Sequence, residues 1–228
     1  MQPQIVDPML KVEKLSKSFE TQLILDDISF EIDKGNTAAI VGPSGSGKTT
    51  FLNIVGTLDL ADSGTVSFNN EDISFMSEKE RTIFRNKHIG FIFQMHYLLP
   101  QCTVFENVLI PTLSYTNKAE KIAAHKRAEY LLEKLNMIQH RNKLPGQLSG
   151  GECQRTAFVR ALINQPELIL ADEPTGSLDE ESASILSNEL ILLNKELNTT
   201  LIIVTHSLLL AEKMNKTWHL HNHKLIAD

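Results

Sequence analysis

The stretch Gly42-Pro43-Ser44-Gly45-Ser46-Gly47-Lys48-Thr49 decides the fold of this 228-residue chain. Its spacing, G-x-x-x-x-G-K-[ST], predicts a loop whose backbone N–H groups surround phosphate oxygens at the start of a helix. We expect Lys48 to neutralise the β- and γ-phosphates of a nucleotide, Thr49 to hold Mg²⁺, and the Thr50 hydroxyl to lie near the α-phosphate. An apolar run of strand length precedes this phosphate loop and an amphipathic segment follows it, which is the context that the motif requires.

Hydrophobic patterns on both sides of the phosphate loop predict an α/β fold. Residues 10–41 have the pattern of strands, and after residue 148 short apolar strands alternate with helices. This alternation favours a largely parallel sheet. The expected strands after residue 36 are 37–41, 64–68, 89–93, 168–171 and 200–204, and the expected helices are 48–56, 103–113, 118–135, 149–163 and 179–197.

The segment 95–147 differs from the rest because its patterns are helical. In its longer helix we expect four apolar side chains to face one way: Ile122, Leu131, Leu132 and Leu135. Pro145-Gly146 closes the segment. The sequence therefore predicts a single domain over residues 10–228, with a core of about 10–93 and 148–228 and an inserted helical subdomain of about 95–147.

The composition is that of an ordinary globular protein, with 42% hydrophobic residues and a formal net charge of −6. No block of basic residues is present, so we expect no nucleic-acid partner. Cys102 and Cys153 have neither a metal-ligand spacing nor that of a disulfide framework. Residues 1–9 lack the pattern of a secretory signal, and the apolar runs are too short to cross a bilayer. A membrane role is therefore expected to come through a partner.

A pair of carboxylates, Asp172-Glu173, ends the predicted strand 168–171. Open parallel sheets place their ligands at this end of the strands. Asp172 is suited to hold Mg²⁺, and Glu173 to polarise a water for attack on the γ-phosphate. His206 ends a strand predicted to be parallel to this one, which favours a contact with the γ-phosphate. The alternatives are an acidic turn before a proline and a structural or merely exposed histidine.

A second glycine motif, Leu148-Ser149-Gly150-Gly151-Glu152, lies about a hundred residues after the first. Ser149 and Glu152 have the spacing of a capping box that opens a helix. A cap does not need Gly150 and Gly151, which allow a backbone to approach a phosphate closely. The start of this helix is therefore a second predicted anion site.

The ordered series of these motifs resembles the nucleotide-binding subunit of ABC transporters, over about residues 10–226. The segments that carry the resemblance are GPSGSGKT at 42–49, Gln94, LSGGE at 148–152, LILADEP at 168–174, Gly176-Ser177-Leu178-Asp179 and His206. The resemblance implies an ATPase with the P-loop NTPase fold of ABC type. In that fold a mostly parallel sheet is joined by an antiparallel β subdomain and an inserted helical subdomain.

The resemblance also implies that the site needs two copies of the chain. Two copies would pack head to tail, so that ATP on one phosphate loop is closed over by Ser149 and Gly151 of the other. Gln94 would link the Mg²⁺ site to the helical subdomain and to integral membrane subunits. Residues 177–179, with Asp179, would lie at the seam between the copies. Phe19 matches the aromatic position that stacks on adenine, where the family usually has tyrosine.

Two further positions depart from the family pattern. Cys153 replaces the more usual polar residue after the second glycine motif, and Ser207 replaces the aspartate common after the histidine. Neither change removes a proposed catalytic group, but Ser207 lacks the carboxylate that would support His206 in the family pattern.

Three alternating histidines near the C-terminus allow two interpretations. His219, His221 and His223 have the spacing of metal ligands on one strand face. However, Asn222-His223-Lys224 resembles the family's terminal hairpin turn, which would put His223 in the turn and off that face. We therefore favour a hairpin without a metal.

Residues 90–100 and 104–108 resemble the lipoprotein-releasing branch of the family most, with the macrolide-exporter and cell-division branches as alternatives. His96 before Leu98-Leu99-Pro100 favours lipoprotein release, although Met95 stands where that branch often has an aromatic residue. This implies a peripheral protein at the cytoplasmic face of a bacterial inner membrane. ABC ATPases that act on DNA or ribosomes form another class. Members of that class carry a long coiled-coil insertion or two ATPase halves, and this chain has neither.

Overall fold

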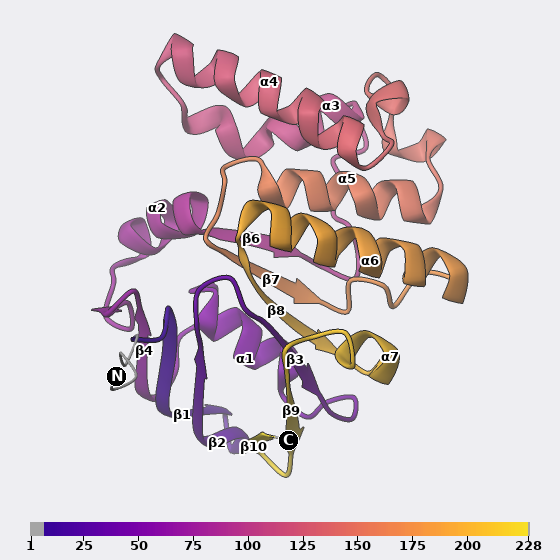
Figure 1. Ribbon diagram of the computed structural model, residues 1–228. Helices are drawn as coiled ribbons and strands as arrows, with labels where there is room; N and C mark the ends of the chain where they lie inside the picture. Colours follow the sequence, from indigo (N-terminus) through magenta and orange to yellow (C-terminus); the bar gives the residue numbers. More distant parts are fainter. Residues whose placement is uncertain (1–6, 228) are drawn as a thin grey trace, which may run out of the picture.

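The computed structural model describes residues 7–227, which form two sheets and the helices that cover them (Figure 1). Of the segment predicted to lack a secretory signal, residues 1–6 lie outside the described part. The strands are β1 (Leu10–Phe19), β2 (Gln22–Ile32), β3 (Thr37–Val41), β4 (Ser63–Phe68), β5 (Glu71–Asp72), β6 (Ile89–Ile92), β7 (Leu168–Asp172), β8 (Thr200–Thr205), β9 (Lys216–His221) and β10 (Lys224–Ala227). The helices are α1 (Lys48–Val55), α2 (Glu78–His88), α3 (Val104–Leu109), α4 (Lys118–Lys134), α5 (Gly150–Leu162), α6 (Glu180–Leu197) and α7 (Leu208–Ala211), with short 3₁₀ turns η1 (Ile110–Ser114), η2 (Ile138–His140) and η3 (Pro145–Gln147).

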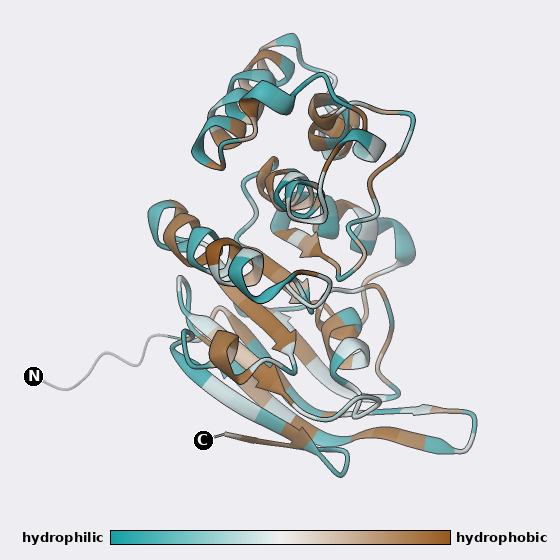
Figure 2. Cartoon of the chain, turned by 90° about the vertical axis from the view of Figure 1, so that its right-hand side faces the viewer, coloured by the Kyte–Doolittle hydropathy of each residue, from teal (hydrophilic) through white to brown (hydrophobic). Residues whose placement is uncertain are grey.

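The larger sheet has the strand order β10-β9-β3-β8-β7-β6 and is parallel except for the edge strand β10. The smaller sheet, in the order β2-β1-β4-β5, is antiparallel throughout. Both findings confirm the predicted α/β class. Every residue of β3 and β8 is buried, as expected for strands covered on both faces. Figure 2 shows these apolar strands in brown at the centre of the molecule, with polar residues on the outer turns of the helices.

The parallel register brings the ends of three strands to one edge of the larger sheet. Val41 of β3 pairs with Thr205 of β8, and Asp172 of β7 pairs with Val204 of β8. The chain therefore leaves all three strands at the same level. The predicted phosphate loop, carboxylate pair and histidine all start from this edge.

Two features of the segment 95–147 differ from the sequence prediction. The helix expected over 103–113 ends at Leu109 and continues as a 3₁₀ turn, because Pro111 has no N–H to donate to the preceding helical turn. Ile122 was expected on the buried face of α4, and this was wrong: it is 49% exposed, whereas Leu131 and Leu132 are buried. Ala124 and Ala128 are buried on that face instead, because they precede Leu131 by seven and three residues, whereas Ile122 precedes it by nine and so points to the opposite side of the helix.

Helix α2 was not predicted at all, although its start carries a clear signal. Ser77 accepts a hydrogen bond from the Glu80 backbone N–H, and the Glu80 carboxylate accepts one from the Ser77 N–H at 2.8 Å. This is the same capping box that was recognised at Ser149. The helix buries one side chain, Phe84, so its hydrophobic periodicity is weak.

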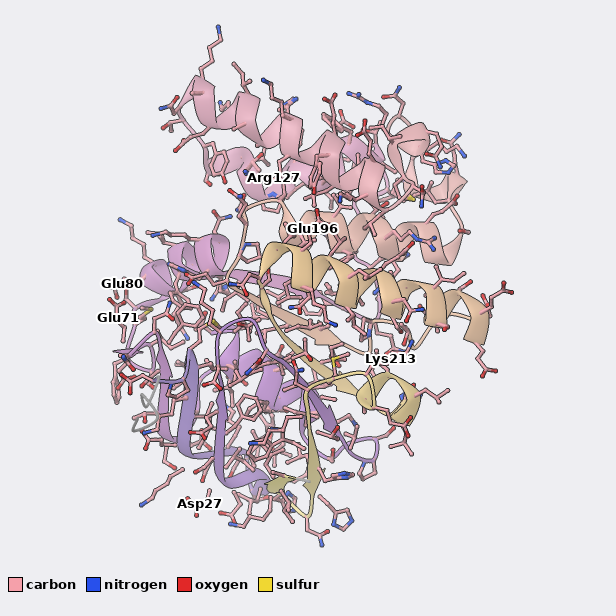
Figure 3. The ribbon with its side chains drawn as sticks, viewed as in Figure 1. Asp27, Glu71, Glu80, Arg127, Glu196 and Lys213 are labelled. Carbon is pink, nitrogen blue, oxygen red and sulfur yellow. The ribbon has the colours of Figure 1, made fainter. Side chains whose placement is uncertain are left out.

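Polar contacts join α4 to the end of α6, where segment 95–147 meets the core (Figure 3). Lys134 binds both carboxylate oxygens of Glu196, at 2.8 and 2.9 Å, and the Tyr130 hydroxyl donates to the same carboxylate. One turn earlier, Arg127 donates to the carbonyl of Ile163 at the end of α5. Side chains of α4 therefore form hydrogen bonds both to α6 and to the end of α5.

The C-terminal hairpin confirms the turn predicted at residues 222–223. Asn222 and His223 both have positive φ, 47° and 65°, as a two-residue hairpin turn requires. His223 thus lies in the turn, whereas His219 and His221 are exposed on β9. No helix within residues 7–227 is both long and apolar enough to cross a membrane.

Gly90 allows the packing of β6 against α5 to be tested. A Cβ at this position in β6 would lie 2.4 Å from the backbone oxygen of Ala161 in α5, which cannot move independently of its helix. We expect Gly90→Ala to lower the free energy of unfolding by about 1–3 kcal/mol, measured by urea denaturation. The matched control is Gly146→Ala, where nothing lies within 4 Å of the added carbon. Equal stability of the two variants would contradict the assigned packing of β6 on α5.

Candidate functional site

The phosphate loop runs from the end of β3 to the first residue of α1. Gly45 and Gly47 have φ values of 78° and 101°, which favour glycine because other residues are strained there. Gly47 is the N-cap of α1, and a Cβ on it would lie 3.0 Å from side-chain atoms of Ile24 and Leu25. The loop is therefore held close to β2, while Pro43, Ser44 and Gly45 remain exposed.

Lys48 is the first residue of α1, and its side chain folds back into the phosphate loop. Its ammonium donates to the carbonyls of Gly42 and Pro43 at 2.8 and 3.0 Å, and the residue is 8% exposed. A positive charge is thus fixed inside the loop, next to the positive end of the helix dipole. This arrangement attracts an anion of high charge, such as a polyphosphate. Thr50, two residues further on, is half-buried in the first turn of the helix.

The phosphate loop and the carboxylate pair meet through one hydrogen bond. The Thr49 hydroxyl donates to Oδ2 of Asp172 at 2.9 Å. Burial raises the pKa of the Asp172 carboxyl, and the neighbouring charge of Glu173 adds to this, while the Thr49 bond and Lys48 act in the opposite direction. A hydroxyl and a partly buried carboxylate in contact are hard oxygen donors of the kind that Mg²⁺ prefers, so the residues present fit this ion.

The structure brings the side chains of Glu173 and His206 into direct contact. Glu173 Oε1 lies 2.9 Å from Nδ1 of His206, and Oε2 accepts from the Thr205 hydroxyl at 3.0 Å. The backbone of Glu173 has a φ of 46°, a strained value for a residue with a side chain, and its N–H bonds to the carbonyl of Val204. Thr205 was missed by the sequence analysis. The available signal was its place as the last residue of a buried strand, directly before the histidine.

Ser207, directly after the histidine, makes hydrogen bonds to two of its neighbours. Its hydroxyl accepts from the Leu210 N–H at 3.3 Å and caps α7, and its own N–H donates to the Thr205 hydroxyl at 3.0 Å. The same threonine hydroxyl binds Glu173. Position 207 is therefore linked to the carboxylate through one intervening side chain.

Gln94 and the loop 176–179 lie next to each other beside this centre. A Cβ placed on Gly176 would lie 3.2 Å from Nε2 of Gln94. Asp179 caps α6 by accepting from the Ser182 N–H at 3.0 Å, and this bond lowers the pKa of its carboxyl. Gln94 and Asp179 are both exposed.

The second glycine motif forms the predicted capping box at the start of α5. Ser149 accepts from the Glu152 N–H at 3.3 Å, and the Glu152 carboxylate accepts from the Ser149 N–H at 2.7 Å. That second bond is the main reason why the pKa of Glu152 is lowered. Cys153 is buried behind the motif and its Sγ lies 3.7 Å from the carbonyl of Pro145.

The predicted site residues therefore fall into separate groups within one copy of the chain. The phosphate loop, the carboxylate pair and His206 form one centre at the sheet edge. In the view of Figure 1, α5 lies above α6, whereas β3 and α1 lie below it. Gly150 is exposed next to Leu178, since a Cβ on it would lie 3.7 Å from that side chain. Phe19 lies at the end of β1 and is 49% exposed.

Comparisons with known proteins find relatives along nearly the whole chain. A sequence model of the family described as ABC transporter matches residues 25–176. The chain is 46% identical over 222 residues to the lipoprotein-releasing system ATP-binding protein LolD 1 of Rhodopirellula baltica, with 96% of each chain covered. It is also 46% identical to the LolD protein of Bacteroides thetaiotaomicron, with 93% of this chain and 96% of the relative covered.

Solved structures agree with this similarity. The dimeric ABC transporter cassette MJ0796 matches with a TM-score of 0.87 and 35% identity, over 95% of this chain and 96% of that one. The same cassette in a post-hydrolysis state bound to ADP and Pi matches with a TM-score of 0.86 and 34% identity, over the same shares. The predicted fold is confirmed over this length.

The raised pKa of Asp172 gives a pH-dependent prediction. A carboxyl with a raised pKa favours the folded state below the pKa of the unfolded chain, and this contribution is lost as the pH rises through the higher folded value. At neutral pH the partly buried charge therefore destabilises the nucleotide-free protein. We expect Asp172→Asn to raise the urea midpoint at pH 7.5, with a smaller gain as the pH falls toward 5.

The matched control is Asp27→Asn, an exposed aspartate on β2 that should change stability by less than about 0.5 kcal/mol. A loss of stability in Asp172→Asn at pH 7.5 would show that the carboxylate is held by more than its bond to Thr49.

Proposed function

This chain belongs to the ABC transporter family and hydrolyses ATP, and we propose that the hydrolysis powers the release of lipoproteins from a bacterial inner membrane. The observation that carries the proposal is the extent of the similarity to a protein named for lipoprotein release. It covers 96% of both chains, so it includes the surface around the nucleotide site as well as the motifs. We further propose a peripheral location at the cytoplasmic face, on integral membrane subunits.

We assign the chemistry to the centre at the sheet edge. Lys48 binds the β- and γ-phosphates, and Thr49, Asp172 and Gln94 hold Mg²⁺. When bound, this ion neutralises charge on the phosphate oxygens. Glu173 polarises the attacking water and takes its proton, while His206 orients the carboxylate and contacts the γ-phosphate. Support comes from the bond between Glu173 and His206, which holds the base on the nucleotide side of the sheet.

We propose that a second copy completes the site in a head-to-tail dimer. Ser149, Gly150 and Gly151 of one copy then close over the nucleotide on the phosphate loop of the other, and Asp179 lies at the seam. Two observations support this arrangement. Within one copy the second glycine motif lies on the other side of α6 from the phosphate loop, and its glycines are not shielded from a partner.

We propose that the membrane subunits dock in a groove of about 430 Å³ between α2, β6, η1 and α5. Its lining combines apolar and basic side chains, among them Leu58, Arg85, Phe91, Phe93, Pro111 and Arg160. Arg160 donates to the carbonyls of His96 and Tyr97 at 2.7 and 2.8 Å. A force on the groove would thus reach the segment that follows Gln94. We propose that residues 95–147 are a helical subdomain, and that this subdomain transmits the force to the core of residues 10–93 and 148–228.

Reconstitution tests the proposed function directly. The protein, its membrane subunits and a fluorescent lipoprotein are placed in liposomes with a soluble acceptor, and transfer to the acceptor is followed on adding ATP. We expect ATP-dependent release. Glu173→Gln should retain ATP binding but slow turnover and release by about 10²–10⁴-fold, because it lacks the general base. ATP hydrolysis without release would refute the assigned cargo, and near-normal turnover of Glu173→Gln would refute its role.

Mixing two inactive variants tests the shared site. Lys48→Ala disables one copy's phosphate loop, and Gly151→Asp disables its second glycine motif. In a mixed head-to-tail dimer, one site combines the intact halves of both. We expect each variant alone to be inactive and an equal mixture to recover about a quarter of wild-type turnover, since about half of the dimers are mixed and each has one intact site. No recovery would contradict the proposed sharing of residues between copies.

A further inference from the structure

Lys17 in β1 is a lysine whose side chain is only 11% exposed. Its ammonium donates to the carbonyl of Leu60 at 2.7 Å and to Oδ1 of Asp59 at 3.2 Å, and Oδ1 of Asp62 lies 3.8 Å away. A buried ammonium is costly unless it is paired and hydrogen-bonded, as it is here. The charge therefore has a fixed position in the structure.

The loop that holds this ammonium is itself fixed to β1. Asp62 accepts from the Ser18 N–H at 2.7 Å, and its own N–H donates to the carbonyl of Ser16 at 2.9 Å. Asp59 accepts from the Leu60 N–H at 2.7 Å with the same oxygen that binds Lys17. The loop and the strand are thus joined on both sides of the lysine, by a backbone bond at Ser16 and by the bond from the Ser18 N–H to the Asp62 carboxylate, so their contact does not depend on the lysine alone.

Phe19 follows Lys17 by two residues at the end of β1, where the pairing with β2 is irregular. The ammonium lies 5.1 Å from the centroid of the Phe19 ring, within the range in which a cation is attracted to an aromatic face. Phe19 is 49% exposed although its neighbour is buried. One ring face is therefore backed by a fixed charge, and much of the side chain remains open to a ligand.

We propose that Lys17 is a positioning residue for the nucleotide base and acts through Phe19. This rests on the proposed function, in which Phe19 stacks on adenine. The ammonium holds the ring in one orientation before the nucleotide arrives, which reduces the ordering that binding must impose. It also draws electron density toward the backed face, so the open face interacts better with an electron-rich purine.

A structural role alone would make a different prediction. If Lys17 only tied β1 to the loop 59–62, its loss would affect every ligand of the phosphate loop equally. An action through the ring affects only ligands that carry a base. Inorganic tripolyphosphate, which has the three phosphates but no base, separates the two roles.

The experiment measures binding of Mg²⁺ with a non-hydrolysable ATP analogue, and of Mg²⁺ with tripolyphosphate, by titration calorimetry on the full chain. The main variant is Lys17→Gln, which keeps a donor for Leu60 and Asp59 but removes the charge. We expect Kd for the ATP analogue to rise about 3- to 10-fold and Kd for tripolyphosphate to stay unchanged. In steady-state hydrolysis KM should rise by the same factor with kcat preserved.

Four further variants complete the design. Phe19→Ala should weaken the ATP analogue about 10- to 100-fold, and adding Lys17→Gln to it should cause no further loss. Lys11→Met is the matched control, since Lys11 is on the same strand but half exposed and paired with Glu13. Lys17→Arg, which keeps the charge, should retain most of the affinity and serves as the second variant if Lys17→Gln is poorly folded.

The results for the variants distinguish the role of Lys17 from the stacking of Phe19 on adenine. Unchanged affinity in Phe19→Ala would refute the proposed stacking on adenine. A clear effect of Phe19→Ala combined with wild-type affinity in Lys17→Gln would overturn the role of Lys17 alone. An equal loss of affinity for tripolyphosphate would also overturn it and leave Lys17 with a structural role.

Discussion

Parallel hydrogen bonding between β3, β8 and β7 sets where the reactive side chains can lie. Val41 pairs with Thr205, and Asp172 pairs with the adjacent Val204, so the phosphate loop, the histidine and the carboxylates leave the sheet within a few residues of one another. A shift of one residue in either pairing would turn the side chains of a strand to the opposite face. The contacts between Thr49 and Asp172 and between Glu173 and His206 therefore depend on this register.

The site holds its charges in place before any nucleotide is present. Lys48 is bound by carbonyls of its own loop, Asp172 by the Thr49 hydroxyl, and Glu173 by Thr205 and His206. Such an arrangement stores unfavourable interactions, as the raised pKa of Asp172 shows. Proteins commonly accept lower stability at sites where function needs buried charge.

The sequence predicted well those features that depend on local pattern. The apolar strands, the glycine loop, the capping box at Ser149 and the turn at residues 222–223 could each be recognised within about ten residues. Helix α2 was missed because it buries only Phe84. Ile122 was misassigned because the helical period was not applied to it: it precedes Leu131 by nine residues, which is half a turn away from the buried face.

Contacts between distant segments could not be predicted from the sequence. Lys17 and Leu60 are 43 residues apart, and Thr49 and Asp172 are 123 apart. Thr205 acquires its role only when β8 lies beside β7. Pairings of this kind arise from the topology of the sheets, which a single sequence does not display.

The capping box at Ser149 restricts which amino acids this position tolerates. Serine, threonine, asparagine and aspartate all cap helices well. Capping uses a lone pair of the hydroxyl, so the proton is not consumed by the bond from Glu152. On the proposed head-to-tail arrangement that proton faces the phosphates of a neighbouring copy. Aspartate would preserve the helix and yet present a negative charge to them. A residue at position 149 therefore has to meet two requirements: it must cap α5 in its own copy, and it must offer no negative charge to the nucleotide bound by the other copy.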